Sequence, residues 1–227
     1  MAPSSANPPG RLRRDAQRNR DLLLAAARDS FSRHGLDVPL DRIAKEAGVG
    51  NATLYRHFPT RDALIAEVFA DAGVGLAAAG QEALAAEDAW TGLERYFERI
   101  LELGAADRGI NDLVTRAVPG VPGVPGVPGV PGVPGAIGIG RGHAATVGSL
   151  IARAQEQGTM RRDVVARDLL SLFGPLCQAL PAITELHPDL WRRYLALLLE
   201  GFRARAARPL PVPPIGERRP DGTAPDA

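Results

Sequence analysis

Residues 39–58 read PLDRIAKEAGVGNATLYRHF and contain the strongest structural signal in the chain. Ile43, Ala44 and Ala47 share the inner face of a short helix, because they repeat at helical spacing. Gly48 follows at a position where a tight turn needs positive φ, which glycine adopts without strain. The stretch therefore predicts a short helix that ends in a glycine turn and leads into a second helix.

The second helix of this stretch presents polar side chains outward. Leu54 and Phe58 lie four residues apart and face inward. A slim cationic helix of this kind fits the major groove of DNA. An ordinary helical hairpin with solvated polar residues is the alternative interpretation of the two helices alone. The outward residues are Asn51, Ala52, Thr53, Tyr55, Arg56 and His57.

Apolar residues repeat at helical spacing along most of the remaining chain, and no stretch alternates convincingly at period two. One helix, around Leu23 and Phe31, is predicted to end at Gly35. A fourth helix is predicted over residues 60–80, with Thr60 as its N-cap. The predicted fold class is all-α, with an N-terminal three-helix domain followed by a helical bundle.

Composition sets the predicted domain boundaries. Both ends of the chain are rich in proline and lack periodicity, so we expect disorder there. The predicted segments are a disordered basic arm at 1–17, a helix-turn-helix domain at 18–76, a helical regulatory and dimerisation domain at 77–206, and a disordered tail at 207–227.

Residues 118–135 repeat Val-Pro-Gly six times. Proline at every third position excludes a helix, and a fully extended run would span about 55 Å. The run also fits the collagen formula, but a triple helix needs three chains and natural ones use many more triplets. We therefore predict a low-complexity surface loop over residues 118–140.

Charge is distributed unevenly along the chain. Residues 1–65 carry 11 basic and 7 acidic side chains, a net charge of +4, whereas the remainder carries −3. A basic head on an acidic body suggests that only the head meets a polyanion.

The strongly apolar runs, such as residues 22–27 and 195–199, are too short to span a bilayer, so no membrane partner is expected. With Cys177 as the single cysteine and no signal-peptide core, a cytoplasmic location is predicted.

Cys177 itself is interpreted as a small buried hydrophobe. His143, like the other histidines outside the motif (His34 and His187), has no ligand spacing and is interpreted as a surface residue.

Residues 19–76 resemble the DNA-binding domain of the TetR family of regulators. The matching signature is Leu54, Tyr55, Arg56, His57 and Phe58, followed at the expected distance by Arg61 and Leu64. The resemblance weakens beyond residue 80. It implies a DNA-binding transcriptional regulator that is a ligand-responsive repressor, with activation as the alternative outcome.

The resemblance also implies roles for single residues. Tyr55 and His57 stand where the family contacts phosphates, and Arg61 stands where a lysine commonly does so. The chain departs from the family at two positions: Gly50 replaces the Ser or Thr that often caps the recognition helix, and Pro39 replaces a hydroxyl residue. The expected DNA-binding set is Pro39, Leu40, Gly50, Asn51, Ala52, Thr53, Tyr55, Arg56, His57 and Arg61.

By the same resemblance, the helical body is expected to form a homodimer and enclose a small-molecule effector. The effector would tilt residues 60–80 and release the dimer from palindromic double-stranded DNA. Apolar faces at 169–180 and 191–202 are predicted to form the dimer interface, and the alternative is that they complete the core of each monomer. The pocket candidates are Phe69, Trp90, Tyr96, Phe97, Leu113, Phe173 and Leu176.

Other functions remain as alternatives at this point. An enzyme or transport-type binder could use the helical body and keep the head as a relic. However, no paired carboxylates, nucleophile constellation, metal spacing or phosphate-binding loop stands out, so neither enzymatic activity nor a cofactor or metal is expected. A structural protein could instead use the Val-Pro-Gly run.

Overall fold

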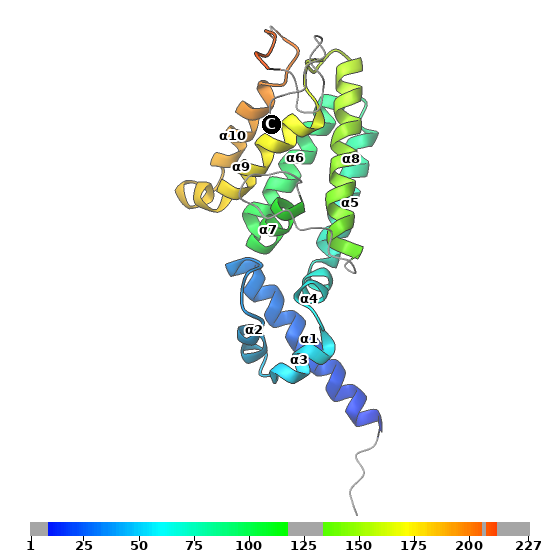
Figure 1. Cartoon of the computed structure of the whole chain (residues 1–227), viewed down its shortest axis with the longest axis vertical. Coiled ribbons are helices and arrows are strands. Elements are labelled where there is room, and N and C mark those ends of the chain that lie inside the picture. Colours follow the sequence, from blue (N-terminus) through cyan, green and yellow to red (C-terminus); the bar gives the residue numbers. More distant parts are fainter. Residues whose placement is uncertain (1–8, 118–133, 206–207, 213–227) are drawn as a thin grey trace, which may run out of the picture.

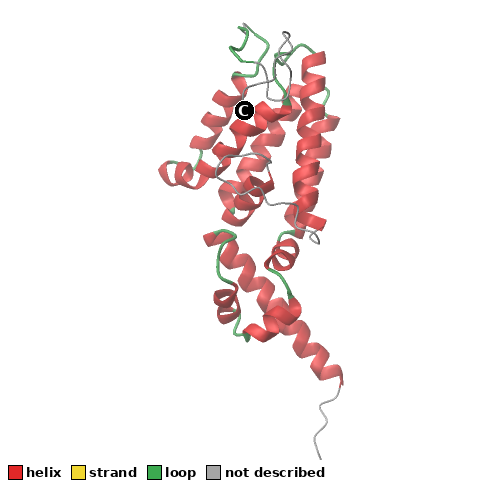
Figure 2. Ribbon diagram, viewed as in Figure 1, coloured by secondary structure: helices red, strands yellow, loops and turns green. Residues whose placement is uncertain are grey.

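The computed structural model describes residues 9–117, 134–205 and 208–212, which fold into helices joined by short loops (Figure 1). The predicted all-α class is confirmed: the described residues contain no β-strand, only an isolated bridge between Met160 and Arg203 (Figure 2). The described helices are α1 Pro9–His34, α2 Leu40–Glu46, α3 Asn51–His57, α4 Arg61–Val68, α5 Ala70–Ala85, α6 Ala89–Ala106, α7 Arg108–Ala117, α8 Pro134–Glu156, α9 Ala166–Leu186 and α10 Leu190–Glu200.

The helices form two groups, which we call the head (α1–α4) and the body (α5–α10). Figure 1 shows the head below the body, with α3 at the far side of the head and α7 directly above the end of α1. The two groups share one buried apolar core, which runs from Leu23 in α1 to Phe202 after α10. Contacts of α1 with α7 and of α4 with α8 connect the head to the body.

Helix α1 begins earlier than predicted. Residues 9–17, expected to be disordered, form its first turns, while residues 1–8 lie outside the described residues. The difference has a local cause, because this stretch is rich in Arg, Leu, Ala and Gln, which are good helix formers. Gln17 also donates a hydrogen bond to Asp21 at 2.8 Å, one turn along. At its other end α1 stops at Gly35, which has φ of +81° as the sequence indicated.

The predicted single helix over residues 60–80 is divided in two. Helices α4 and α5 meet at Phe69 and bend by 57°. The guanidinium of Arg28 donates to the carbonyl of Val68, which would otherwise continue the helical hydrogen bonding. The Phe69 ring is buried beside Phe31, with 6.2 Å between ring centroids. These tertiary contacts with α1 explain a break that helical periodicity does not reveal.

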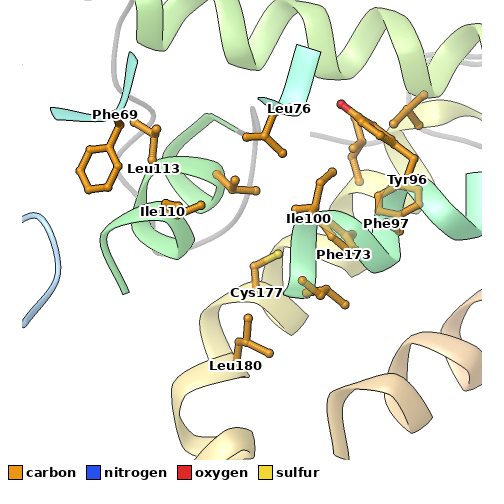
Figure 3. Packing of buried hydrophobic residues seen from close by; sticks show 14 of the residues in the cluster. Phe69, Leu76, Tyr96, Phe97, Ile100, Ile110, Leu113, Phe173, Cys177 and Leu180 are labelled. Atoms are coloured by element: carbon orange, nitrogen blue, oxygen red, sulfur yellow. The ribbon is translucent and has the colours of Figure 1, made fainter. Parts of the chain in front are cut away.

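Helix α9 is held in the core despite two internal prolines. Pro181 has no N–H to donate to the carbonyl of Cys177, and the side-chain amide of Asn111 in α7 donates to that carbonyl instead, at 3.0 Å. Cys177 is buried, as predicted, and burial raises the pKa of its thiol. Figure 3 shows Cys177 between Leu180 and Phe173 on the inner face of α9.

By length and composition α9 could also cross a membrane, and the bent pair α4–α5 would pass the same test together. The sequence predicted an apolar helical face at 169–180 but no membrane span there, because polar residues such as Arg167 and Gln178 interrupt the apolar runs of α9. In this fold α9 packs against α6, α7, α8 and α10. The buried core helix of a globular protein has the same composition.

The predicted low-complexity loop is only partly within the described residues. Residues 118–133 lie outside them, whereas Pro134 and Gly135, the end of the Val-Pro-Gly run, begin α8. Proline suits this place, because the first turn of a helix needs no N–H donor. Residues 134–140 are therefore helical and not loop.

At the other end of the chain, residues 208–212 of the predicted tail are described, and Arg161 donates to the carbonyl of Arg208 at 2.7 Å.

Candidate nucleic-acid interface and internal cavity

The turn between α2 and α3 has the geometry that the sequence predicted. Gly48 has φ of +66°, and the N–H of Val49 bonds to the carbonyl of Ala44 at 2.9 Å. Leu54 and Phe58 are both 1% exposed and fix the inner face of α3. The guanidinium of Arg20 in α1 lies 5.4 Å from the centroid of the Phe58 ring. The turn and these contacts set the orientation of α3.

The outer face of α3 is polar and open to solvent. Asn51, Ala52, Tyr55 and Arg56 are exposed, while Thr53 and His57 are half-buried. Within the described part of the chain Arg56 makes no ion pair, so its charge is available to a partner. Its exposed side chains, Asn51, Tyr55 and Arg56, can donate hydrogen bonds to phosphates and base edges.

Three of the predicted contact residues, Pro39, Leu40 and Gly50, stand at the starts of α2 and α3 and have no polar side chain. Leu40 is 7% exposed, because it shares a face of α2 with Ile43 and Ala44, so its side chain cannot reach DNA. Pro39 and Gly50 are exposed at the N-cap positions of α2 and α3. Neither cap makes a side-chain hydrogen bond. A DNA contact by Leu40 therefore remains a prediction for its main chain alone.

Arg61 has a structural contact that the sequence did not indicate. Its Nη1 donates to the carbonyls of Leu36 and Val38, at 2.8 and 2.7 Å. The side chain is half-buried and connects the start of α4 to the loop between α1 and α2. A phosphate contact by Arg61 remains a prediction, and it would use the other nitrogens of the guanidinium.

Residues 35–38, which we call the clamped loop, are also held from the body. Asp112 in α7 accepts a hydrogen bond from the N–H of Leu36 at 2.8 Å. A Cβ on Gly35 would lie 2.4 Å from the Asp112 carboxylate, so only glycine permits this approach. Arg116, one turn along α7, forms an ion pair with Asp37 at 2.8 Å. The clamped loop is thus fixed between α4 of the head and α7 of the body.

Replacing Asp112 with alanine is expected to lower the free energy of unfolding by about 1.5–3 kcal/mol, since a hydrogen bond to a charged group is lost. The amide of Leu36 should also lose protection from hydrogen exchange. Urea denaturation and exchange measured by NMR test both effects.

The matched control is Asp37→Ala. Asp37 is 86% exposed, and a surface ion pair of this kind contributes about 0–1 kcal/mol. Equal losses of stability in the two variants would show that the hydrogen bond to Asp112 contributes no more than the surface ion pair of Asp37.

A cavity of about 630 Å³ lies between α4, α5, α6, α7 and α8. Three of the seven predicted pocket residues line it, namely Phe69, Tyr96 and Leu113. Figure 3 shows Phe69 and Leu113 near each other and Tyr96 at a distance from both. The remaining lining residues, which were not predicted, are Ile65, Ala66, Ala70, Gly73, Val74, Leu76, Ala77, Gln81, Ile100, Val114, Gly142, His143 and Thr146.

The other four pocket candidates lie outside the cavity lining. Phe97 and Phe173 pack on each other in the core, with 4.3 Å between ring centroids. Trp90 is buried under the guanidinium of Arg203, which lies 4.0 Å from the centroid of the Trp90 ring. Leu176 packs against the core from its edge. Large apolar residues in a helical bundle are mostly core, and periodicity alone does not distinguish them from a cavity wall.

The interpretation of His143 as a surface residue is wrong. Its ring is 6% exposed, and Nδ1 lies 3.1 Å from the hydroxyl of Tyr96. Burial lowers the pKa of His143 to about 4 and raises the pKa of Tyr96 to about 12, so both side chains are neutral near pH 7. The sequence does hold a signal, because His143 shares a helical face with Val147 and Leu150.

Two family models match the chain. The model described as "Bacterial regulatory proteins, tetR family" matches residues 23–68, which contain α2, α3 and α4. The model described as "Transcriptional regulator SbtR-like, C-terminal domain" matches residues 138–204, which cover most of α8 and all of α9 and α10. The two matched regions thus lie in the head and in the body.

Similar proteins include an HTH-type transcriptional regulator of Staphylococcus aureus (strain USA300), 41% identical over 54 residues. That match covers 23% of this chain and 29% of the relative, so the chain spans less than a third of its length. A TetR transcription regulatory protein from Mycobacterium vanbaalenii is 32% identical, over 85% of this chain and 99% of that chain, with a TM-score of 0.41. The ketosteroid transcriptional regulator KstR2 of Mycobacterium tuberculosis is 18% identical over 82% of this chain and 95% of that chain. Its TM-score of 0.59 shows a likeness of fold.

Proposed function

The chain belongs to the TetR family of DNA-binding transcriptional regulators, and from this premise we propose that it is a ligand-responsive repressor acting in the cytoplasm. As a homodimer it binds a palindromic operator, and a small molecule in the body releases it. The observation that carries the proposal is the outer face of α3, where the exposed Asn51, Tyr55 and Arg56 project from a helix with a fixed inner face.

Major-groove recognition is supported by the chemistry of this face. Arg56 can form a bidentate contact with a guanine, and Asn51 can do the same with an adenine. Tyr55 is suited to a phosphate, which positions the helix without reading sequence. His57 would have to contact a phosphate through Nδ1, because its Nε2 is buried. In this proposal α2 lies across the phosphate backbone, as the first helix of a helix-turn-helix does.

The apolar faces predicted for the dimer interface, at 169–180 and 191–202, mostly complete the core of the subunit: Leu169, Phe173 and Trp191 are at most 2% exposed. Dimerisation is supported by a different, exposed apolar seam on the last two helices. On α9 the exposed apolar residues repeat with alternating spacings of three and four, which is the pattern of a coiled-coil seam. On α10, Tyr194 and Leu197 continue the surface, at 38% and 60% exposure. A second copy of the same seam would cover both helices and form a four-helix interface. The exposed seam residues of α9 are Leu172, Pro175, Ala179, Ala182 and Leu186.

The route from effector to DNA runs through two helices that contact both the cavity and the head. Helix α4 lines the cavity with Ile65 and holds the clamped loop with Arg61. Helix α7 lines the cavity with Leu113 and holds the same loop with Asp112. An effector that moves either helix changes the position of α3 without touching it.

Replacing Arg56 with alanine is expected to weaken binding to the operator by about 1–3 kcal/mol, which is roughly 5- to 150-fold. Arg56 is exposed, so folding should be unchanged. Fluorescence anisotropy with duplexes from the region flanking the gene gives the affinity. A salt series should show a steep linear fall of log affinity with log salt, because phosphate contacts release counterions.

Arg99→Ala is the matched control, since Arg99 is exposed on α6 in the body and forms a surface ion pair with Glu102. It should bind DNA as the native protein does. If the native protein does not bind these duplexes at low salt, or if Arg56→Ala and Tyr55→Ala both bind normally, the assignment of α3 to the major groove is wrong.

A further inference from the structure

The cavity has an apolar end and a polar end. Helices α4 and α7 and the first half of α5 contribute apolar side chains, including Phe69 and Leu113. The polar side chains come from the later part of α5, from α6 and from α8. Figure 3 places Phe69 and Leu113 on one side and the Tyr96 hydroxyl on the other. The polar lining residues are Gln81, Tyr96, His143 and Thr146.

Among the described residues that line the cavity, none carries a formal charge near neutral pH. No Asp, Glu, Lys or Arg is among them, and burial lowers the pKa of His143 to about 4. A buried ion without an oppositely charged partner is strongly unfavourable. The described wall therefore disfavours a ligand that enters as an anion or a cation.

The Tyr96–His143 pair has one hydrogen-bond donor that remains unused. If the histidine proton is on Nε2, Nδ1 accepts from the Tyr96 hydroxyl and the Nε2–H has no partner among the described residues. If the proton is on Nδ1, that N–H donates to Tyr96, and the hydroxyl proton is free. Because Nε2 is itself buried, it is the second tautomer, with a free Tyr96 hydroxyl proton, that offers a donor to an acceptor atom in the cavity.

We infer that the cavity binds an uncharged, mainly apolar molecule with an acceptor oxygen, such as a ketone, an ester or an ether. The apolar body lies against Phe69 and Leu113, and the oxygen accepts a hydrogen bond from the Tyr96 hydroxyl, which Nδ1 of His143 holds in place. The volume of about 630 Å³ lies within the range of about 300–1,000 Å³ usual for ligand pockets. This inference rests on the proposed function, because it specifies the effector class of the same cavity.

Three probes of equal chain length test the inference by calorimetric titration of the full chain at pH 7.5: 2-octanone, octanoate and octylamine. The ketone should bind, and each of the two ions should bind at least about tenfold more weakly than the ketone. The shorter 2-hexanone should bind about fourfold more weakly for each methylene removed, since each buried methylene contributes a similar increment. Tighter binding of octanoate or octylamine, or no binding of 2-octanone, would overturn the inference.

Variants separate the cavity from non-specific uptake. Tyr96→Phe should weaken 2-octanone binding by about 2- to 10-fold and leave the dependence on chain length unchanged. Ala77→Trp places a large ring at an exposed position of the lining and should abolish binding without disturbing the core. Ser149→Ala, exposed on α8 and outside the lining, is the control. Equal binding to Ala77→Trp and native protein contradicts the inference even if Tyr96→Phe does not fold.

Failure of this inference is distinguishable from failure of the proposed function. Binding of the ligand-free protein to duplex DNA depends on α3 and not on which probe enters the cavity. If the protein binds DNA but prefers octanoate to 2-octanone, the proposed function stands and only the inferred effector class is wrong.

Discussion

Replacing Leu197 with glutamate is expected to produce a folded monomer that has lost high-affinity binding to a palindromic duplex. Leu197 is 60% exposed on α10, so the substitution removes little from the core of the subunit. In the proposed dimer the same side chain lies in the interface, where two glutamates related by the two-fold axis would bury charge without a partner. Burial of an unpaired charge costs more than a surface apolar residue contributes.

The loss of DNA affinity should be large, because two linked heads bind much more tightly than one. A second head bound to the same operator acts at a high effective concentration, which raises the overall affinity by about 100- to 10,000-fold. Light scattering after size-exclusion chromatography gives the mass, and anisotropy with a two-half-site duplex gives the affinity. A duplex with a single half-site should bind the native protein and the variant more nearly equally.

Ala152→Glu provides the matched control, since it adds the same charge at an exposed position on α8, outside the seam. It should remain dimeric and bind the operator. A Leu197→Glu protein that stays dimeric, together with normal operator affinity, would show that the exposed face of α9 and α10 is not the interface.

Most of the head could be predicted from sequence, because its signals are local. The positive φ of Gly48 and the N-cap of Thr60 depend on residues within one turn, and both are confirmed. The inward faces of Leu54 and Phe58 follow from their spacing and are also confirmed. Residues close in sequence are enough to indicate these features.

The features that sequence reasoning missed depend on contacts between distant residues. The break at Phe69 requires Arg28 from α1. The half-buried place of Arg61 requires carbonyls of the clamped loop, 23 and 25 residues away. The cavity requires five helices to leave space between them, and no periodicity within one helix indicates that space. His143 was wrongly assigned to the surface because the glycine-rich stretch before it obscures the helical face that it shares with Val147 and Leu150.

Acidification is expected to destabilise the native protein through His143. In the unfolded chain the imidazole takes up a proton near its ordinary pKa of 6.5, whereas burial lowers the pKa in the folded chain to about 4. Below pH 6.5 the unfolded state therefore binds more protons than the folded state, and the free energy of unfolding falls as pH falls. The difference in pKa corresponds to a loss of about 3 kcal/mol by pH 4, with no loss above pH 7.

The substitution His143→Phe isolates this contribution, because phenylalanine fills the same space among Tyr96, Phe97 and Phe173 and does not titrate. The variant loses the hydrogen bond to Tyr96, so its stability at pH 7 is expected to be lower by about 1 kcal/mol. Between pH 6.5 and 4, however, its urea midpoint should fall less steeply than that of the native protein. The exposed His34→Gln control should follow the native profile. Parallel profiles for His143→Phe and the native protein would contradict this prediction. They would show that the imidazole between α6 and α9 is protonated as easily as one in water.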